Sequence, residues 1–281
     1  MRILVAGTGF TGSRILHQLM SSGHEVWGLN RQGRCEGGFP VLPGDVLAEK
    51  GLASLSVLPE MDLLISTLSG TGQQDPAAYR SVYVDGPRRI MDQLRWRAER
   101  EAWMLGSTGV YGMRDGAWVD EETEVEPMHR NGEVQVAAEE ALRNAADRCS
   151  ILRLSGLYGP GRTRLIRQAL RKRPYLKAEI WSNQIHADDV AGLVTFLVDR
   201  DAAAPELLLV SDKEPAQRQE IFSWIRQEMN LLEGVYDEDH SLRAGADRGN
   251  KRINSQKMQA LGYPLRYPTF RQGLKPLLNV E

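Results

Sequence analysis

Short apolar runs alternate with longer segments of helical periodicity over the first half of the chain. The short runs are rich in Ile, Leu, Val and Trp and have the length of buried strands. The longer segments repeat apolar residues every three or four positions, as an amphipathic helix does. Strands are expected over 2–6, 25–29, 39–46, 61–67, 102–108 and 149–154, and helices over 10–23, 77–96 and 133–146.

This alternation is typical of βαβ units, which build a parallel sheet covered by helices on both faces. We therefore expect an α/β, doubly wound parallel sheet over residues 1–155, with a return segment near 183–210. After residue 155 the pattern breaks into shorter pieces with many turns. Residues 156–281 are expected to form a smaller C-terminal lobe.

A glycine-rich turn joins the first expected strand to the first expected helix. Its residues, Gly7-x-Gly9-x-x-Gly12, have the spacing of the dinucleotide-binding turn of Rossmann sheets. The first glycine permits the tight turn, the second admits the pyrophosphate, and the third lets helix and strand pack closely. The alternative, a glycine-rich turn without a ligand, is less favoured because strand and helix flank the motif as the mechanism requires.

The end of the second strand carries information on which dinucleotide binds. NAD sites usually place an acidic residue there, which holds the ribose hydroxyls. This chain has Asn30 followed by Arg31, with Arg34 close behind. A guanidinium suits a 2′-phosphate, so NADP is expected and NAD is the second choice. The alternative is that both arginines are solvated surface residues.

Composition excludes several classes of protein. The 281 residues are 42% hydrophobic and 26% charged, with a formal net charge of −2. These values are ordinary for a soluble globular chain and disfavour nucleic-acid or membrane-surface binding. Apolar stretches fall short of the ~18 residues of a membrane span, and the N-terminal run is too short for a secretory signal. The two cysteines, Cys35 and Cys149, favour reduced thiols, and hence a cytoplasmic protein.

The motifs together resemble the short-chain dehydrogenase/reductase superfamily, in its extended, epimerase/dehydratase-like branch. They are similar to the atypical YeeZ-like proteins, which are described as predicted nucleoside-diphosphate-sugar epimerases. The matching segments are GTGFTG at 7–12, STGVYG at 107–112, ILRLSGLYGPGR at 151–162, IHADDVAG at 185–192 and NKRINSQKMQALGY at 250–263. The resemblance implies a Rossmann domain with bound NAD or NADP and a smaller C-terminal substrate lobe. The cofactor-binding residues expected are Gly7, Gly9, Phe10, Thr11, Gly12, Asn30, Arg31, Asp45, Thr67 and Leu157.

Active relatives carry a Ser or Thr that hydrogen-bonds the reacting oxygen, and Ser107 matches it, with Thr108 beside it. They also carry a Tyr-x-x-x-Lys pair on the next helix, where Tyr supplies the proton. An alignment on Glu139 puts Asn131 and Gln135 at these two positions. An alignment one residue on, at Glu140, gives Gly132 and Val136 instead. Neither register restores the pair, so the usual acid–base chemistry is in doubt.

Two further departures weaken the expectation of a sugar nucleotide. Residues 182–184 read Ser-Asn-Gln where relatives often have an Arg for the diphosphate, and Tyr83 stands where they often have Asn.

The candidate catalytic residues are therefore Ser107, Thr108 and Tyr111. Tyr111 is a candidate acid because it lies near the expected site, although relatives carry it for structural reasons. His186 is a weaker candidate base, since a His near a strand end is more often a structural residue. His, Cys and Asp residues have no metal-ligand spacing, so no metal is expected.

Basic residues form a second candidate site in the C-terminal lobe. Their alternative role is a solvated helix face, which we favour over an anion site. The residues are Arg162, Arg164, Arg167, Arg171, Lys172 and Arg173, with Lys251 and Arg252 further along the chain.

Two functional hypotheses follow from these residues. The first is an NAD(P)-dependent epimerase, dehydratase or reductase that acts on a small anionic or sugar-nucleotide substrate without the usual Tyr and Lys. The second is a non-catalytic NADP-binding sensor or partner-binding protein. A homodimer is expected by analogy with related folds alone.

Overall fold

The computed structural model describes residues 1–35, 37–70, 73–170, 180–231 and 249–279. Its internal contacts divide the chain into two compact units. Unit 1 consists of Met1–Ser107, Glu133–Arg153 and Val190–Leu208, and unit 2 of Thr108–Gly132, Leu154–Asp189 and Leu209–Glu281. The domain boundary expected at residues 155 and 156 stays a prediction.

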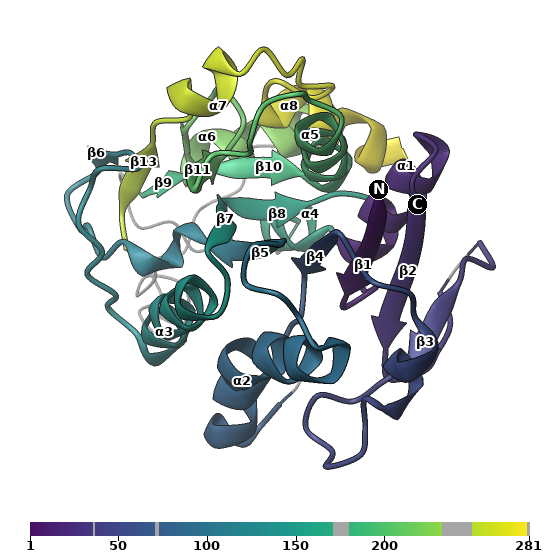
Figure 1. Cartoon of the computed structure of the whole chain (residues 1–281). Helices are drawn as coiled ribbons and strands as arrows, with labels where there is room; N and C mark the ends of the chain where they lie inside the picture. Colours follow the sequence, from purple (N-terminus) through teal and green to yellow (C-terminus); the bar gives the residue numbers. More distant parts are fainter. Residues whose placement is uncertain (36, 71–72, 171–179, 232–248, 280–281) are drawn as a thin grey trace. The chain divides into compact units, whose positions relative to one another are not determined.

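A seven-stranded sheet runs through the structure in the order β11-β7-β5-β4-β1-β2-β3 (Figure 1). Strand β1 pairs in parallel with β2 on one side and with β4 on the other. The chain thus builds the sheet outward from β1 in one direction and then in the other, which makes a topological switch point at β1 and β4. The strands are Arg2–Ala6 (β1), Glu25–Asn30 (β2), Val41–Pro43 (β3), Leu63–Ser66 (β4), Glu101–Ser107 (β5), Arg148–Leu154 (β7) and Leu207–Val210 (β11).

Helices cover both faces of this sheet. Figure 1 shows α2 and α3 on one face and α1 and α5 on the other. Because alternate side chains of a strand point to opposite faces, Leu4 and Leu64 pack with Ile90 of α2 and Leu142 of α3. The expectation of a doubly wound parallel Rossmann sheet is confirmed. The helices are Gly12–Ser21 (α1), Pro76–Leu94 (α2), Arg130–Ala145 (α3) and Ala187–Val198 (α5).

Helix α2 covers nearly the range expected from the sequence and continues through Gly86-Pro87. Gly86-Pro87 predicts a bend or a new turn, but the structure has one helix with Pro87 inside it. Asp75 begins the helix, since its carboxylate accepts hydrogen bonds from the amides of Ala77 and Ala78 at 3.0 and 3.2 Å. A residue with a Cβ at Gly86 would approach Leu68 to 2.9 Å, so this point of the helix packs tightly.

Unit 2 contains short strand pairs and helices. Strands β6 (Ala117–Val119) and β13 (Lys251–Ile253) pair in parallel, as do β8 (Gly156–Tyr158) and β10 (Gln184–His186). Strands β9 (Trp181–Ser182) and β12 (Ala216–Gln217) pair antiparallel. The described helices are Arg164–Ala169 (α4), Arg218–Glu228 (α6), Gln256–Ala260 (α7) and Phe270–Leu274 (α8). In the part of the chain that the structure describes, every helix is too short or too polar to cross a membrane.

Candidate cofactor and catalytic site

The glycine-rich turn follows β1 and opens α1. Gly7 has a φ of +101°, and a Cβ there would lie 2.7 Å from the carbonyl oxygen of Thr67, so only glycine fits. A Cβ on Gly12 would collide with the Gly7 carbonyl oxygen. A Cβ on Gly9, in contrast, would meet no atom within 4 Å. Two glycines therefore serve packing, and the third leaves the backbone open to an approaching group.

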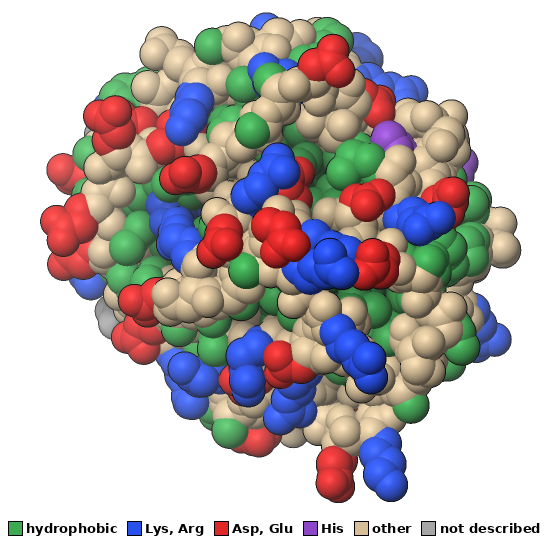
Figure 2. All heavy atoms as spheres, in the orientation of Figure 1, with side chains coloured by type: hydrophobic (Ala, Val, Ile, Leu, Met, Phe, Trp, Pro, Cys, Tyr) green, Lys and Arg blue, Asp and Glu red, His purple; other side chains and the backbone are tan. Residues whose placement is uncertain are grey.

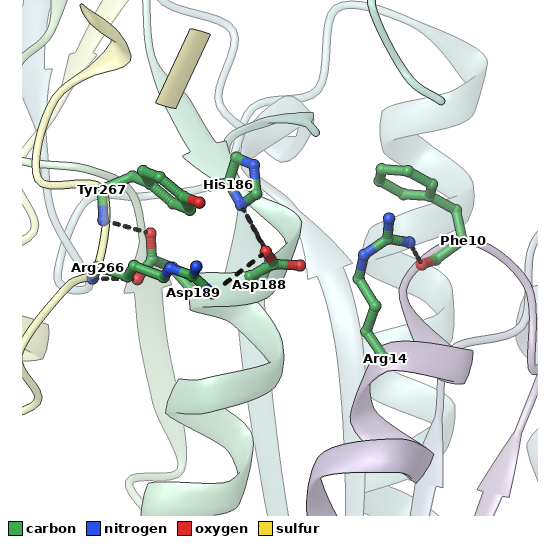
Figure 3. A network of polar contacts seen from close by, with 7 residues as sticks. All are labelled: Phe10, Arg14, His186, Asp188, Asp189, Arg266 and Tyr267. Carbon is green, nitrogen blue, oxygen red and sulfur yellow. Dashed lines mark hydrogen bonds and ion pairs between the residues drawn. The ribbon is translucent and has the colours of Figure 1, made fainter. Parts of the chain in front are cut away.

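The start of α1 offers hydrogen-bond donors to that open space. The first amides of an α-helix have no partner within the helix, and the helix dipole favours an anion there. Thr11 is the N-cap residue, but its side chain makes no capping hydrogen bond. Arg14 lies over Phe10, with its Cζ 4.3 Å from the ring centroid, and donates to the Phe10 carbonyl oxygen at 2.5 Å (Figure 3). This turn is therefore shaped to receive a phosphate group.

The side chain of Asn30, the last residue of β2, is fully occupied by hydrogen bonds within unit 1. Its Nδ2 donates to Thr8 Oγ1 at 2.6 Å and to the Arg34 carbonyl oxygen at 2.8 Å. Its Oδ1 accepts from the amides of Gln32 and Gly33 at 2.9 and 2.8 Å. We predicted Asn30 as a cofactor contact, and that role stays a prediction. The geometry adds a role that sequence reasoning missed, because Asn30 shapes the loop after β2.

Arg31 and Arg34 are exposed on this loop. Neither forms a hydrogen bond or ion pair through its guanidinium with another described residue. Asp45 lies after β3, and its Oδ1 accepts from the Leu47 amide at 2.9 Å, which is a local turn contact. Thr67 follows β4 and donates through Oγ1 to the Gly7 carbonyl oxygen at 2.5 Å. Unit 1 thus brings the glycine turn, Thr67 and the arginine loop to the carboxyl ends of β1, β2 and β4.

The three candidate catalytic residues fall on both units. Ser107 is the last residue of β5, in unit 1. Thr108 and Tyr111 lie in unit 2, at and just after the 3₁₀ turn Thr108–Val110. Thr108 Oγ1 donates to the Leu154 carbonyl oxygen at 3.3 Å, and the Tyr111 hydroxyl donates to the Asp120 carbonyl oxygen at 2.9 Å. Tyr111 is 1% exposed, so its geometry favours a structural role, and its catalytic role stays a prediction.

Helix α3 carries the positions of the expected Tyr and Lys. Asn131 is exposed and Gln135 is buried, one turn further along the helix. Glu139 accepts two hydrogen bonds from the Arg153 guanidinium, at 2.9 and 2.7 Å, and both side chains are almost completely buried. This ion pair fixes the helix against β7 inside unit 1. Neither Asn131 nor Gln135 has a titratable side chain, so these two positions of α3 cannot supply a proton.

A lysine side chain is buried in unit 2. Lys251 is 6% exposed, and its Nζ donates to the Tyr111 carbonyl oxygen at 2.8 Å. Burial lowers the pKa of Lys251 from 10.5 to about 8. The contact connects β13 to the turn that carries Tyr111. An anion-binding role of Lys251, the alternative to a solvated face, stays a prediction.

His186 and its neighbours anchor the C-terminal segment of unit 2 (Figure 3). The His186 ring packs against Tyr267, with ring centroids 4.1 Å apart, and its Nδ1 accepts from the Asp188 amide at 3.1 Å. Asp189 accepts from the amides of Arg266 and Tyr267 at 2.6 and 3.0 Å. Burial raises the pKa of Asp189, although these two hydrogen bonds partly offset the shift. The arrangement is that of a structural network.

The remaining predicted residues lie as follows. Leu157 is the middle residue of β8 and pairs with Ile185. Within the basic segment, α4 spans Arg164–Ala169, and Arg171, Lys172 and Arg173 lie outside the described residues. Acidic and basic side chains are interspersed over the face seen in Figure 2. Among the described residues, His, Cys, Asp and Glu form no group of three or more that could hold a metal.

Comparisons with known proteins agree with this geometry. The model of the NAD dependent epimerase/dehydratase family matches residues 3–210. A proposed NAD-dependent epimerase/dehydratase from Methylobacillus flagellatus is 30% identical, with a TM-score of 0.83 over 99% of this chain and 97% of that chain. A search of curated protein sequences finds no match.

Two more distant structures share the fold. The human epimerase family protein SDR39U1, solved with NADPH, is 16% identical with a TM-score of 0.81, and each chain is covered completely. MoeE5, solved with UDP-glucose and NAD, is 22% identical with a TM-score of 0.77 over 99% of this chain and 97% of that one. The glycine turn, the parallel sheet and the match over 3–210 lead to one conclusion. The chain belongs to the NAD-dependent epimerase/dehydratase family.

Proposed function

We propose that this protein binds NADP(H) and catalyses an epimerase, dehydratase or reductase reaction on a small anionic or sugar-nucleotide substrate. The observation that carries the cofactor assignment is the pair Arg31 and Arg34. Both are exposed at the end of β2, and their guanidinium groups are not paired with any described carboxylate. Two such cations, with no acid at position 30, suit a 2′-phosphate and leave the ribose hydroxyls of NAD without their usual acceptor.

The glycine turn supports the same cofactor. The open space at Gly9 accommodates a pyrophosphate, which the N-terminus of α1 and the free Thr11 hydroxyl can bind. A bound nicotinamide would supply or accept hydride, and the chain must orient it and move the accompanying proton. The Arg14 side chain stacks on the Phe10 ring and so restricts the position of Phe10 in this turn.

Ser107 supports an enzymatic role. It closes β5 at the carboxyl edge of the sheet, where the active sites of open α/β sheets lie. In this proposal its hydroxyl donates a hydrogen bond to the reacting oxygen of the substrate. MoeE5 was solved with UDP-glucose, which supports including sugar nucleotides in the proposed substrate class.

A sensor that binds NADP without turnover is the second candidate. It is favoured by α3, where Asn131 and Gln135 cannot donate or accept a proton at neutral pH. The Tyr111 hydroxyl, the nearest tyrosine in sequence, is hydrogen-bonded to the Asp120 carbonyl oxygen. The two candidates differ in whether any substrate is turned over.

A turnover screen distinguishes them. Purified protein is incubated with NADPH, or with NADP⁺, and a panel of carbonyl compounds, alcohols and sugar nucleotides, while nicotinamide absorbance and product formation are followed. If the protein is an enzyme, we expect turnover of at least one compound. Ser107→Ala should then lower the turnover rate by about 10²-fold or more, the size expected for the loss of a hydrogen-bond donor to a reacting oxygen. Ser56→Ala is the matched control, because Ser56 is exposed and its hydroxyl donates to the carbonyl oxygen of Ala53, three residues away. Tight NADPH binding without turnover across the panel would favour the sensor.

A further inference from the structure

A guanidinium group lies against two indole rings in unit 2. The Cζ atom of Arg252 is 4.9 Å from the ring centroid of Trp118 and 4.9 Å from that of Trp181. The three residues come from β13, β6 and β9, and the parallel register of β13 and β6 pairs Arg252 with Trp118. Both distances are within the ~6 Å over which an aromatic face attracts a cation. The two rings therefore hold the guanidinium in a defined position.

Backbone contacts complete this arrangement. Arg252 Nε donates to the Gly116 carbonyl oxygen at 2.7 Å. Gly116 has a φ of +79°, and a Cβ there would come within 2.9 Å of the Trp181 ring. Asn250 connects the segments that carry Gly116 and Trp181. Its Oδ1 accepts from the Trp181 amide at 2.8 Å, and its carbonyl oxygen accepts from the Gly116 amide at 3.0 Å. Segments distant in sequence thus converge on one side chain.

Among the described residues, no acidic side chain pairs with the positive charge of Arg252. Gly116, Trp118, Trp181 and Asn250 are uncharged, and Arg252 forms no ion pair with any residue that the structure describes. Its Nε donor is satisfied, and the two Nη groups carry the remaining four donors of the guanidinium. Their planar edge matches the two oxygens of a carboxylate or phosphate. A half-buried, oriented cation of this kind is suited to an anionic ligand.

The ring of Trp118 adds a second recognition element. Trp118 is 56% exposed, which is unusual for so large an apolar side chain. The solvent-accessible part of its indole can stack with a flat ring, and such aromatic pairs contribute about 0.5–1.5 kcal/mol beyond area burial. The guanidinium edge and the exposed indole together favour a ligand that is both planar and anionic.

We propose that Arg252 and Trp118 form a binding site for an aromatic ligand that carries a phosphate or carboxylate group. The Nη edge of Arg252 binds the anion, and the Trp118 indole stacks on the ring. Every residue of the site lies in unit 2. This site contains no residue of the glycine-rich turn or of the arginine loop, so it is independent of the cofactor and of the proposed reaction.

Calorimetric titration of the full chain without cofactor tests the site. Phenyl phosphate carries both ring and charge, inorganic phosphate carries only the charge, and phenol carries only the ring. We expect phenyl phosphate to bind about tenfold more tightly than either of the others, since each element adds binding free energy. Benzoate distinguishes a carboxylate site from a phosphate site. Equal affinity for phenyl phosphate and inorganic phosphate, or no binding of phenyl phosphate at millimolar concentration, would overturn the proposal.

Variants assign the binding to these residues. Arg252→Gln should weaken phenyl phosphate binding about tenfold or more, and Arg252→Lys should restore only part of it because the planar fork is lost. Trp118→Leu should remove the preference for phenyl phosphate over inorganic phosphate, and its exposed position makes misfolding no concern. Arg266→Gln is the matched control, since Arg266 is an exposed arginine stacked 5.3 Å from the Tyr267 ring in the same unit. Unchanged binding in Arg252→Gln and Trp118→Leu would contradict the assignment.

Discussion

The side-chain amide of Asn30 donates a hydrogen bond of 2.6 Å to Thr8 Oγ1, and this contact joins the end of β2 to the glycine-rich turn. The same amide group also donates to the carbonyl oxygen of Arg34. One side chain therefore contacts both the glycine-rich turn and the arginine loop. The arginines that would read a 2′-phosphate are presented by a loop that Asn30 shapes.

Asn30→Asp tests this role. The change removes both Nδ2 donors and adds a negative charge beside the arginine loop. We expect NADPH affinity to fall about tenfold or more and NADH affinity to fall less, because the new carboxylate repels a 2′-phosphate and can accept from ribose hydroxyls. Titration of both cofactors measures the ratio. Asn254→Asp, on a loop of unit 2, is the control and should leave the ratio unchanged.

Loss of one partner of the Glu139–Arg153 ion pair should destabilise the fold more than loss of both. Arg153→Met leaves a buried carboxylate without its main partner and should lower the free energy of unfolding by about 3–5 kcal/mol. The double variant Glu139→Leu/Arg153→Met removes both charges and should regain most of that loss. Urea denaturation of the two variants measures the difference. A double variant less stable than Arg153→Met would contradict this account of the pair.

Because of Lys251, the free energy of unfolding should change with pH in the alkaline range. Its pKa is lowered from 10.5 to about 8 in the folded state, so between these values the unfolded chain binds more protons. The free energy of unfolding contributed by this group therefore rises from pH 8 to pH 10.5, by about 3 kcal/mol in total. Lys251→Met should remove the rise. Lys257→Met, at an exposed helix position, serves as the control, and an identical pH profile in wild type and Lys251→Met would refute the prediction.

Because of Asp212, the free energy of unfolding should fall as the pH rises from the acidic range. It is fully buried, and burial raises its pKa well above 3.8, with Glu214 and Asp189 adding like charge nearby. The folded state keeps this proton after the unfolded chain has lost it, so the contribution to stability falls as pH rises above about 4. Asp212→Asn should flatten that fall. The test is the unfolding midpoint measured from pH 4 to pH 8, and a slope unchanged by the substitution would show that another group is responsible.

The sequence predicts the sheet, its helices and the glycine turn because each follows from local patterns. Periodicity defines β1 and α1, and the spacing of Gly7, Gly9 and Gly12 defines the turn between them. The sequence does not predict that Asn30 would organise a loop, although Asn with a nearby Gly33 is a known turn combination. Nor does it predict the contact of Arg252 with Trp118 and Trp181, because strand pairing in the tertiary fold brings these three residues together. Contacts between distant segments have no signature in local patterns.

Direct titration with NADPH and NADH tests whether the arginine loop selects NADP over NAD. The wild-type chain is predicted to bind NADPH at least about tenfold more tightly than NADH, equivalent to roughly 1.4 kcal/mol. Arg31→Gln/Arg34→Gln should remove this preference by weakening NADPH binding alone. Tighter binding of NADH by the wild type, or equal loss of both cofactors in the double variant, would contradict the account.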